Sequence, residues 1–213
     1  MTLRSLCLAL ATTILLASCV APDTRHRVVI SVPEQRMAVL DNGAVIATYQ
    51  VSTSKFTISD APGSNGTPLG ELEIAEKIGG SAPSGAVFKN RRRTGEVIQP
   101  DAPGRDPIVS RILWLRGLES NNANAYGRFI YIHGTPEERN IGRPASFGCI
   151  RMRSSDVIQL YDIVGPRAKV TIANAPLEAV LPAQSPAPVA QAINKSESRI
   201  SKSETNPKTE SRQ

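Results

Sequence analysis

The chain has 213 residues and a formal net charge of +6, with 40% hydrophobic and only 4% aromatic residues. This length allows one or two domains, and the hydrophobic fraction suits one core of modest size. A basic chain can bind nucleic acid, an anionic membrane surface or a carboxylate-rich substrate. Because the few aromatic residues are not interleaved with the basic ones, the stacking platform of a nucleic-acid-binding protein is missing, and no nucleic acid partner is expected.

The N-terminal residues have the pattern of an export signal. A short positively charged start precedes residues 5–17, an apolar run that is too short for a comfortable membrane span. The run leads into Leu-Ala-Ser-Cys, which resembles the lipobox of bacterial lipoproteins, where the cysteine is lipidated and becomes the first residue. We therefore predict a lipoprotein signal peptide at residues 1–18, a lipid anchor on Cys19 that holds the protein on a membrane, and a spacer at residues 19–26. The alternative is an ordinary secretory signal with an incidental cysteine.

Cys149 is expected to be the sole free thiol of the mature protein. Cys7 lies inside the predicted signal peptide, and Cys19 is the predicted lipidation site. Exported proteins usually pair their cysteines in disulfides, so a solitary thiol is either buried and inert or retained for chemistry. A redox role would need a resolving cysteine, and none is left in the sequence.

Valine- and isoleucine-rich runs in the first third of the chain predict a β-meander. The dipeptide Asn42-Gly43 favours a hairpin turn, because both residues tolerate positive φ. The predicted strands are residues 27–32, 36–40, 44–51 and 71–78. Residues 79–106 follow as a long irregular stretch that contains three consecutive arginines, Arg91 to Arg93. Such a loop in a compact domain is usually functional or mobile.

The remainder of the predicted domain contains three strands and one helix. The predicted strands are residues 108–115, 129–133 and 169–172. The helix is expected to begin near Ser154, whose hydroxyl would cap it, and to end before Gly165-Pro166. The following residues, 175–213, are rich in alanine, proline, serine, lysine and glutamate, and we predict a disordered tail. The folded unit is therefore predicted at residues 27–174, mainly β with one clear helix.

His133 and Cys149 are the pair of residues that points to nucleophilic catalysis. A free cysteine is only a few per cent thiolate at neutral pH, and a nearby histidine either stabilises the thiolate as an imidazolium or transfers protons. Gly148 permits an unusual backbone conformation beside the sulfur, where N–H groups can form an oxyanion hole. Taken separately, such a cysteine is more often a buried core thiol, and such a histidine a structural hydrogen bonder. Two histidines and one free cysteine have no zinc-like spacing, so no metal and no cofactor is expected.

The residues around this pair resemble the signature of the L,D-transpeptidase catalytic domain, the YkuD family. The motifs that carry the resemblance are His-Gly-Thr at 133–135, Ser-Phe-Gly-Cys-Ile-Arg-Met at 146–152, Asn-Gly-Thr-Pro-Leu-Gly at 65–70 and Ile-Gly-Arg-Pro at 141–144. The resemblance covers the predicted folded unit. It implies an L,D-transpeptidase-like β-sandwich with one short helix after the catalytic cysteine.

The resemblance also implies a role for each matched residue. Cys149 would be the nucleophile that attacks a peptide carbonyl in peptidoglycan. His133 would accept and donate the proton, with the carbonyl of Gly134 orienting its imidazole. Ser146 and Gly148 are expected to bind substrate or to orient the site.

Arginine side chains offer partners for the free carboxylates of peptidoglycan stem peptides. Arg151 is expected either to hold a substrate carboxylate bidentately or to form a surface ion pair. The run from Arg91 to Arg93 either attracts these carboxylates or is merely solvated surface.

Phe147 departs from the family pattern, because many members carry histidine at this position. Phenylalanine transfers no proton, so His133 would serve alone. We expect a peptidoglycan L,D-transpeptidase in the periplasm, anchored to a membrane through Cys19, that crosslinks stem tetrapeptides or attaches a protein to them. The alternatives are an L,D-carboxypeptidase, in which water accepts the acyl group, and a lipid-anchored peptidoglycan-binding module with weakened catalysis.

Overall fold

The computed structural model describes residues 21–182. The predicted signal peptide, with Cys7, the predicted anchor Cys19 and residues 183–213 of the predicted tail lie outside the described residues. Ten strands in one hydrogen-bonded sheet dominate the described part, with two α-helices and two short 3₁₀ turns, so the predicted mainly β fold is confirmed. No helix within residues 21–182 is long and apolar enough to span a membrane.

The strands and helices occupy most of the positions that the sequence predicted. The strands are β1 (His26–Ser31), β2 (Arg36–Asp41), β3 (Ala44–Gln50), β4 (Gly70–Ile78), β5 (Ala86–Lys89), β6 (Arg92–Val97), β7 (Ile108–Gly117), β8 (Tyr131–Gly134), β9 (Ile150–Met152) and β10 (Lys169–Ala173). The helices are α1 (Ser154–Ile163) and α2 (Leu177–Val180), and the 3₁₀ turns are η1 (Ser120–Asn122) and η2 (Glu138–Asn140).

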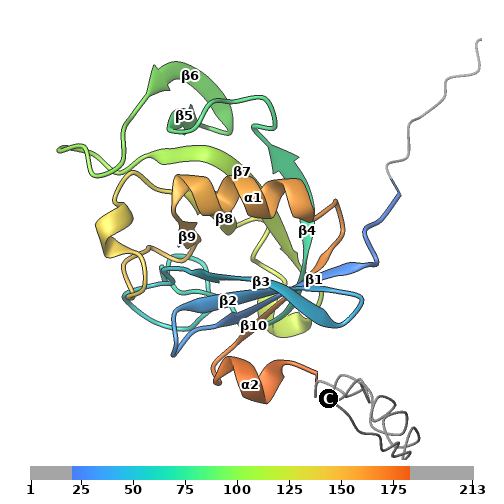
Figure 1. Cartoon of the computed structure of the whole chain (residues 1–213). Helices are drawn as coiled ribbons and strands as arrows, with labels where there is room; N and C mark the ends of the chain where they lie inside the picture. The colour runs from blue at the N-terminus through green and yellow to red at the C-terminus, as the bar shows by residue number, and fades with distance from the viewer. Residues whose placement is uncertain (1–20, 183–213) are drawn as a thin grey trace, which may run out of the picture. The chain divides into compact units, whose positions relative to one another are not determined.

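Strand β7 is the centre of the sheet, because it pairs with β4, β5 and β8. The strand order is β3-β2-β1-β10-β4-β7-β5-β6, with β8 on β7 and β9 on β8. The pairs β1–β10 and β8–β9 are parallel, and the others are antiparallel. Register shifts interrupt the β4–β7 and β7–β8 ladders, and such irregularities bend a sheet. The sheet therefore folds over, and β1, β2 and β10 lie across the core from β7, β8 and β9 (Figure 1).

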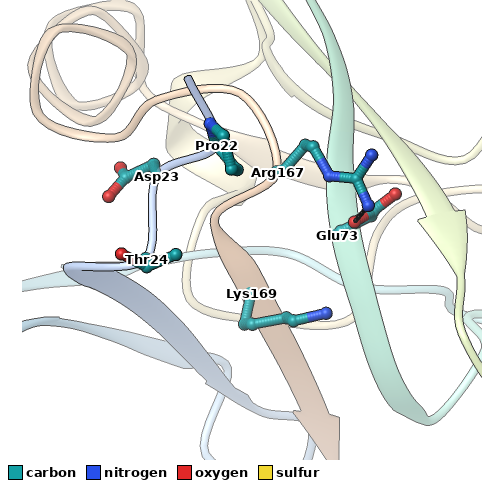
Figure 2. A pocket seen from close by; sticks show the side chains of 6 residues that line it. All are labelled: Pro22, Asp23, Thr24, Glu73, Arg167 and Lys169. Atoms are coloured by element: carbon teal, nitrogen blue, oxygen red, sulfur yellow. Dashed lines mark ion pairs between the residues drawn. The ribbon is translucent and has the colours of Figure 1, made fainter.

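The residues that precede β1 are attached to the folded domain. The Asp23 carboxylate accepts a hydrogen bond from the Gly165 N–H at 2.6 Å, so the predicted spacer is docked from this residue onward. A cavity of about 530 Å³ lies beside this segment, and in it the Arg167 guanidinium is 3.6 Å from the Glu73 carboxylate (Figure 2). Its lining residues are Pro22, Asp23, Thr24, Glu73, Arg167 and Lys169.

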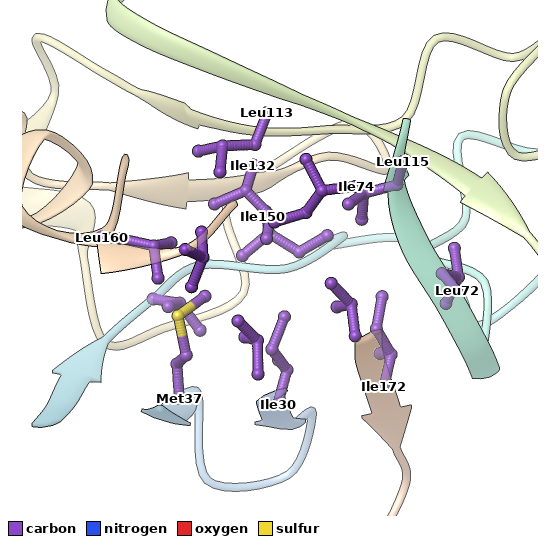
Figure 3. Packing of buried hydrophobic residues seen from close by; sticks show 14 of the residues in the cluster. Ile30, Met37, Leu72, Ile74, Leu113, Leu115, Ile132, Ile150, Leu160 and Ile172 are labelled. Carbon is purple, nitrogen blue, oxygen red and sulfur yellow. The ribbon is translucent and has the colours of Figure 1, made fainter. Parts of the chain in front are cut away.

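The main core lies between the two halves of the folded sheet. Leu113, Ile132 and Ile150 enter it from one half, and Ile30 and Met37 enter it from the other (Figure 3). Helix α1 adds the apolar side chains of Val157 and Leu160, and Val164, the residue that follows the helix, packs in the same core. Each fully buried aliphatic side chain contributes about 1.5–3 kcal/mol. This packing holds the backbones of β7, β8 and β9 in place, together with the side chains on their other face.

Helix α1 begins differently from the prediction. Ser154 is its first residue and not its cap, and the cap residue Arg153 makes no side-chain capping bond. The cap comes from η2, where the Glu138 carboxylate accepts a hydrogen bond from the Ser154 N–H at 2.8 Å. The Ser154 hydroxyl is instead bonded to the hydroxyl of Ser110 at 2.8 Å. A cap from another part of the chain leaves no local signal in the sequence.

Residues 79–106 are not the irregular stretch that the sequence predicted. They contain the antiparallel hairpin β5–β6, whose turn residues Asn90 and Arg91 have φ values of 52° and 65°. Positive φ at both positions is typical of a type I′ turn. The signal was weak because every residue of β6 is exposed, so that strand has no apolar alternation.

Residues 177–180 form helix α2 within the stretch that the sequence predicted as a disordered tail. Leu177 is buried against Val29, Ala38 and Leu40, on the face of β1 and β2 that is turned away from the main core. The folded domain therefore extends beyond its predicted end at residue 174. One buried leucine in a segment rich in alanine and proline gave too weak a periodic signal to predict this helix.

Candidate active site

Strands β8 and β9 place His133 and Cys149 on the same face of the sheet. The two strands run parallel, with Ile132 opposite Ile150 and His133 opposite Arg151. Side chains alternate between the faces of a strand, and Ile132 and Ile150 point into the main core. His133 and Arg151 therefore point away from that core, and Cys149, two residues before Arg151, shares their face. The common face results from β9, a strand between the cysteine and helix α1 that the sequence had not revealed.

Two backbone groups hold the sulfur of Cys149. The Tyr131 N–H lies 3.4 Å from Sγ as a donor, and the Phe129 carbonyl oxygen lies 3.4 Å from Sγ as an acceptor. Phe129 has a φ of 60°, which is unusual for a bulky residue, and the predicted strand at 129–133 begins only at Tyr131. The left-handed turn at Phe129 thus directs its carbonyl oxygen at the thiol.

The Cys149 thiol is protonated at neutral pH. Burial raises its pKa above the ordinary value, while the Tyr131 N–H and the positive charges of Arg151 and Arg128 oppose this effect. The thiol therefore needs a base to become a nucleophile.

His133 is neutral and has a fixed tautomer. Its side chain is buried, and burial together with the nearby Arg151 charge lowers the pKa to about 4, although the hydrogen bond to Gly134 acts in the opposite direction. Nδ1 lies 2.8 Å from the Gly134 carbonyl oxygen. Since a carbonyl oxygen only accepts, Nδ1 carries the hydrogen and Nε2 has the free lone pair. The geometry suits a general base and not a resting imidazolium beside a thiolate.

Arg151 is occupied by carboxylates of this chain. Its guanidinium is buried, with Nη2 at 2.7 Å from Asp106 Oδ2 and Nη1 at 3.7 Å from Glu137 Oε2. The other oxygen of Asp106 accepts a hydrogen bond from the Thr135 hydroxyl at 2.6 Å. Arg151 thus forms a buried ion pair that links β9 to Asp106 and, through Asp106, to Thr135 near His133. This differs from both predicted roles, a substrate ligand and a surface ion pair.

Ser146 and Gly148 shape the turn that presents the thiol. The Ser146 hydroxyl donates to the Cys149 carbonyl at 2.6 Å and accepts from the Gly148 N–H at 3.2 Å. Gly148 has a φ of 119°, and a Cβ atom there would lie 2.9 Å from the Gly66 carbonyl oxygen. The Thr67 hydroxyl donates to the Gly148 carbonyl at 3.0 Å. The two motifs around residues 67 and 148 therefore meet in space, and the Gly148 N–H is used inside the turn.

Cys149 opens into a cleft of about 310 Å³. The lining residues are Pro62, Gly63, Asn65, Gly127, Arg128, Ile130, Phe147 and Cys149. Arg128 fixes one wall, because its guanidinium bonds the Asp60 carboxylate at 2.9 Å and the Gly66 carbonyl at 2.8 Å. The larger cavity in Figure 2 contains none of the predicted site residues, so the smaller cleft, which is lined by Cys149, is the candidate active site.

Arg91 covers the aromatic side of the site. Its guanidinium lies 4.7 Å from the ring centroid of Trp114 and 5.1 Å from that of Phe129, and it is 3.4 Å from the Tyr131 hydroxyl. The neighbouring Arg92 and Arg93 are exposed on β6. The prediction treated the three arginines alike, but only the first packs against the segment that touches the sulfur. The sequence offered one signal for this packing, because Trp114, Phe129 and Tyr131 are aromatic partners on which a guanidinium can stack.

Within residues 21–182 there is no group of three or more histidine, cysteine or acidic side chains arranged to hold a metal ion.

The comparison with protein families agrees with this geometry. The sequence profile of the YkuD family, described as the L,D-transpeptidase catalytic domain, matches residues 25–172 and thus more than half of the chain. This chain belongs to the L,D-transpeptidase catalytic domain family. The matched stretch contains both His133 and Cys149 and ends one residue before the end of β10.

Relatives with provisional L,D-transpeptidase assignments are known in Bacillus subtilis (strain 168). YqjB is 28% identical over 155 residues, which cover 72% of this chain and 75% of YqjB. YkuD is 29% identical over 147 residues, which cover 69% of this chain and 65% of YkuD. A solved structure of an L,D-transpeptidase from Mycobacterium smegmatis aligns with a TM-score of 0.45 at 18% identity, over 70% of this chain and 58% of that one. The matched part is thus less than two thirds of the solved protein.

Proposed function

We propose that this L,D-transpeptidase-family protein acts on peptidoglycan stem tetrapeptides through an acyl-enzyme on Cys149. The observation that carries the proposal is the arrangement of a thiol that lines a cleft with a neutral imidazole on the same sheet face. Because Nδ1 of His133 is bonded to the Gly134 carbonyl, Nε2 is the nitrogen available for proton transfer.

In the first half-reaction, Nε2 of His133 takes the thiol proton of Cys149, and the sulfur forms a bond to the scissile carbonyl carbon. The tetrahedral intermediate then breaks its carbon–nitrogen bond. The imidazolium returns the proton to the departing amine, and a terminal D-amino acid leaves. The product is a thioester on Cys149 with His133 again neutral.

In the second half-reaction, an amine of an acceptor attacks the thioester carbonyl and gives a proton to His133. The carbon–sulfur bond breaks, and the imidazolium protonates the thiolate, which restores the resting site. When water replaces the amine, the same acyl-enzyme gives an L,D-carboxypeptidase. The two outcomes differ only in the second nucleophile.

We further propose that the protein is exported and held on a membrane in the periplasm by a lipid on Cys19. The support is the lipobox-like sequence and the short distance along the chain between Cys19 and Asp23, which is bonded to the domain. An anchor there would keep the domain close to the bilayer. The Cys19→Ala variant should leave the membrane fraction, and its retention there would contradict the anchor.

The catalytic proposal is tested with the full chain in detergent, a disaccharide tetrapeptide and a primary amine acceptor. Liquid chromatography with mass spectrometry should detect the released D-amino acid and the acylated acceptor. Cys149→Ala should abolish both products, while Ser155→Ala, an exposed change on α1, should leave them unchanged. Binding of the peptide without any product would favour the peptidoglycan-binding module instead.

A further inference from the structure

Exposed apolar side chains gather around the cysteine. Within residues 21–182, seven large hydrophobic side chains are exposed, and four of them belong to segments that contact the Cys149 turn or its sulfur. These four are Phe56, Ile58, Phe129 and Phe147. Contiguous exposed apolar surface often marks a binding site, whereas scattered single residues are ordinary.

Lys55, Phe56 and Phe147, which we call the Phe–Lys cluster, form the most compact part of this surface. The two phenyl rings have centroids 5.2 Å apart at an angle of 51°, and 53% of Phe56 and 56% of Phe147 are exposed. The Lys55 ammonium lies 4.6 Å from the Phe147 centroid and 5.2 Å from the Phe56 centroid. A cation and two half-open aromatic faces are thus presented together to solvent.

The cluster has a fixed position relative to the sulfur. The Lys55 N–H donates to the Ser146 carbonyl at 3.1 Å, which joins it to the cysteine turn. The Ser54 hydroxyl accepts from the Phe56 N–H at 3.0 Å and donates to the Asn65 carbonyl at 2.6 Å. Phe147 itself lines the cleft that contains Cys149. The surface of the Phe–Lys cluster is therefore continuous with the cleft, so one ligand can contact both.

The charges in this region favour an anion. Within residues 21–182, Lys55 makes no ion pair with an acidic side chain. The residues that line the cleft include no aspartate or glutamate, and Arg128 among them is paired with the buried Asp60 carboxylate, so Lys55 is the charge left for an anion. An ammonium over two rings retains outward N–H donors, so a carboxylate whose neighbouring carbons pack on the rings matches both features.

We propose that the Phe–Lys cluster binds a free carboxylate of the acyl-donor peptide, with the adjacent aliphatic carbons lying on Phe56 and Phe147. This inference rests on the proposed function and names a determinant of its substrate specificity. It gives Phe147 a role in binding, where a histidine would have supplied a proton-transfer group and a more polar surface.

The test measures binding without turnover. The full chain with Cys149→Ala is titrated by calorimetry with a peptidoglycan tetrapeptide whose carboxylates are free, and with the same peptide converted to primary amides. The free-carboxylate peptide should bind about 1.4- to fivefold more tightly, the range of an exposed charge pair. Adding Lys55→Met, which keeps the aliphatic stem, should remove this preference, whereas Lys169→Met on β10 should preserve it. Adding Phe147→Ala should weaken the binding of both peptides.

An unchanged preference in the Lys55→Met protein would overturn the inference, as would equal or undetectable binding of both peptides. Its failure is distinguishable from that of the proposed function. A Lys55-dependent preference without acylation of the wild-type protein would leave the site standing and remove the catalytic proposal. Acylation without any carboxylate preference would support the catalytic proposal and remove the proposed carboxylate site.

Discussion

Nδ1 of His133 lies 2.8 Å from the carbonyl oxygen of Gly134, and this contact leaves Nε2 as the ring nitrogen with a free lone pair. The carbonyl fixes the tautomer of the imidazole without carrying a charge. Burial keeps both the imidazole and the thiol neutral. In the proposed mechanism the two groups therefore rest as a neutral pair and become charged only during the reaction.

The reactivity of Cys149 toward iodoacetamide should show a raised thiol pKa. At pH 7 the sulfur should react more slowly than a free cysteine, and the rate should keep increasing as the pH rises above 8.5. Stopped alkylation reactions analysed by intact mass would give the rate at each pH. A rate that is constant from pH 5 upward would instead indicate an imidazolium–thiolate pair.

His133 should make the stability of the fold depend on pH. The pKa of His133 is about 4 in the folded protein, whereas its ordinary value is 6.5. The unfolded state therefore binds more protons than the folded state between these two pH values. Stability is fully present above pH 6.5 and falls as the pH decreases toward 4, by a contribution of about 3 kcal/mol. Urea unfolding at pH 7 and pH 4.5 measures this loss. His133→Gln should make the two free energies of unfolding more similar, and an unchanged difference would contradict the assignment.

Removing the base should also reduce the rate of the reaction. His133→Gln should lower kcat/KM by about 10²- to 10⁴-fold, because proton transfer from the thiol and to the leaving amine are both lost. Single-turnover release of the D-amino acid is the appropriate measurement. A decrease smaller than tenfold in a folded variant would mean that another group acts as the base.

Gly148→Ala should displace the thiol. A Cβ at this position meets the Gly66 carbonyl oxygen at 2.9 Å, and the φ of 119° is strained for alanine. We therefore expect the free energy of unfolding to fall by about 1–3 kcal/mol. Gly95→Ala is the matched control, since that glycine has a φ of 92° but open space around it. The alkylation rate of Cys149 should change only in the first variant. Equal effects of both variants would show that strain alone matters and not the contact with residue 66.

Arg91→Met should loosen the segment that holds the sulfur. The side chain loses its cation–π contacts with Trp114 and Phe129, each worth about 0.5–2 kcal/mol. Trp114 is the single tryptophan of the chain, so its fluorescence should shift together with a lower melting temperature. Arg92→Met, on the exposed strand β6, should change neither measurement. A fluorescence shift of the same size in both variants would argue against the packed position of Arg91.

The sequence predicted the features that depend on local pattern. The strands up to residue 78 follow from apolar alternation, and the position of α1 follows from its start and stop signals. The role of the His133–Cys149 pair stays a prediction from the family resemblance. Features that depend on distant partners were missed. Arg151 was placed at the surface or on substrate because nothing local reveals Asp106, and the cap on Ser154 comes from Glu138 in η2.

The hairpin β5–β6 and helix α2 were missed for a different reason. The exposed strand β6 begins with three polar or charged residues and has no alternation of apolar and polar side chains. Its sequence therefore gives no sign that its backbone pairs with β5. In α2, Leu177 is the one fully buried side chain, with Val180 partly buried beside it. Both elements are stabilised by the surface that they cover, and that surface exists only after the rest of the sheet has formed.

The formation of a thioester on Cys149 is the most direct test of the proposed acyl-enzyme mechanism. The full chain is mixed with the disaccharide tetrapeptide without an acceptor, quenched in acid and analysed by intact and peptide-level mass spectrometry. We expect an adduct of the substrate minus its terminal residue, located on Cys149, that forms much more slowly in His133→Gln. An adduct on another residue, or release of the terminal residue by the Cys149→Ala protein at the wild-type rate, would contradict it.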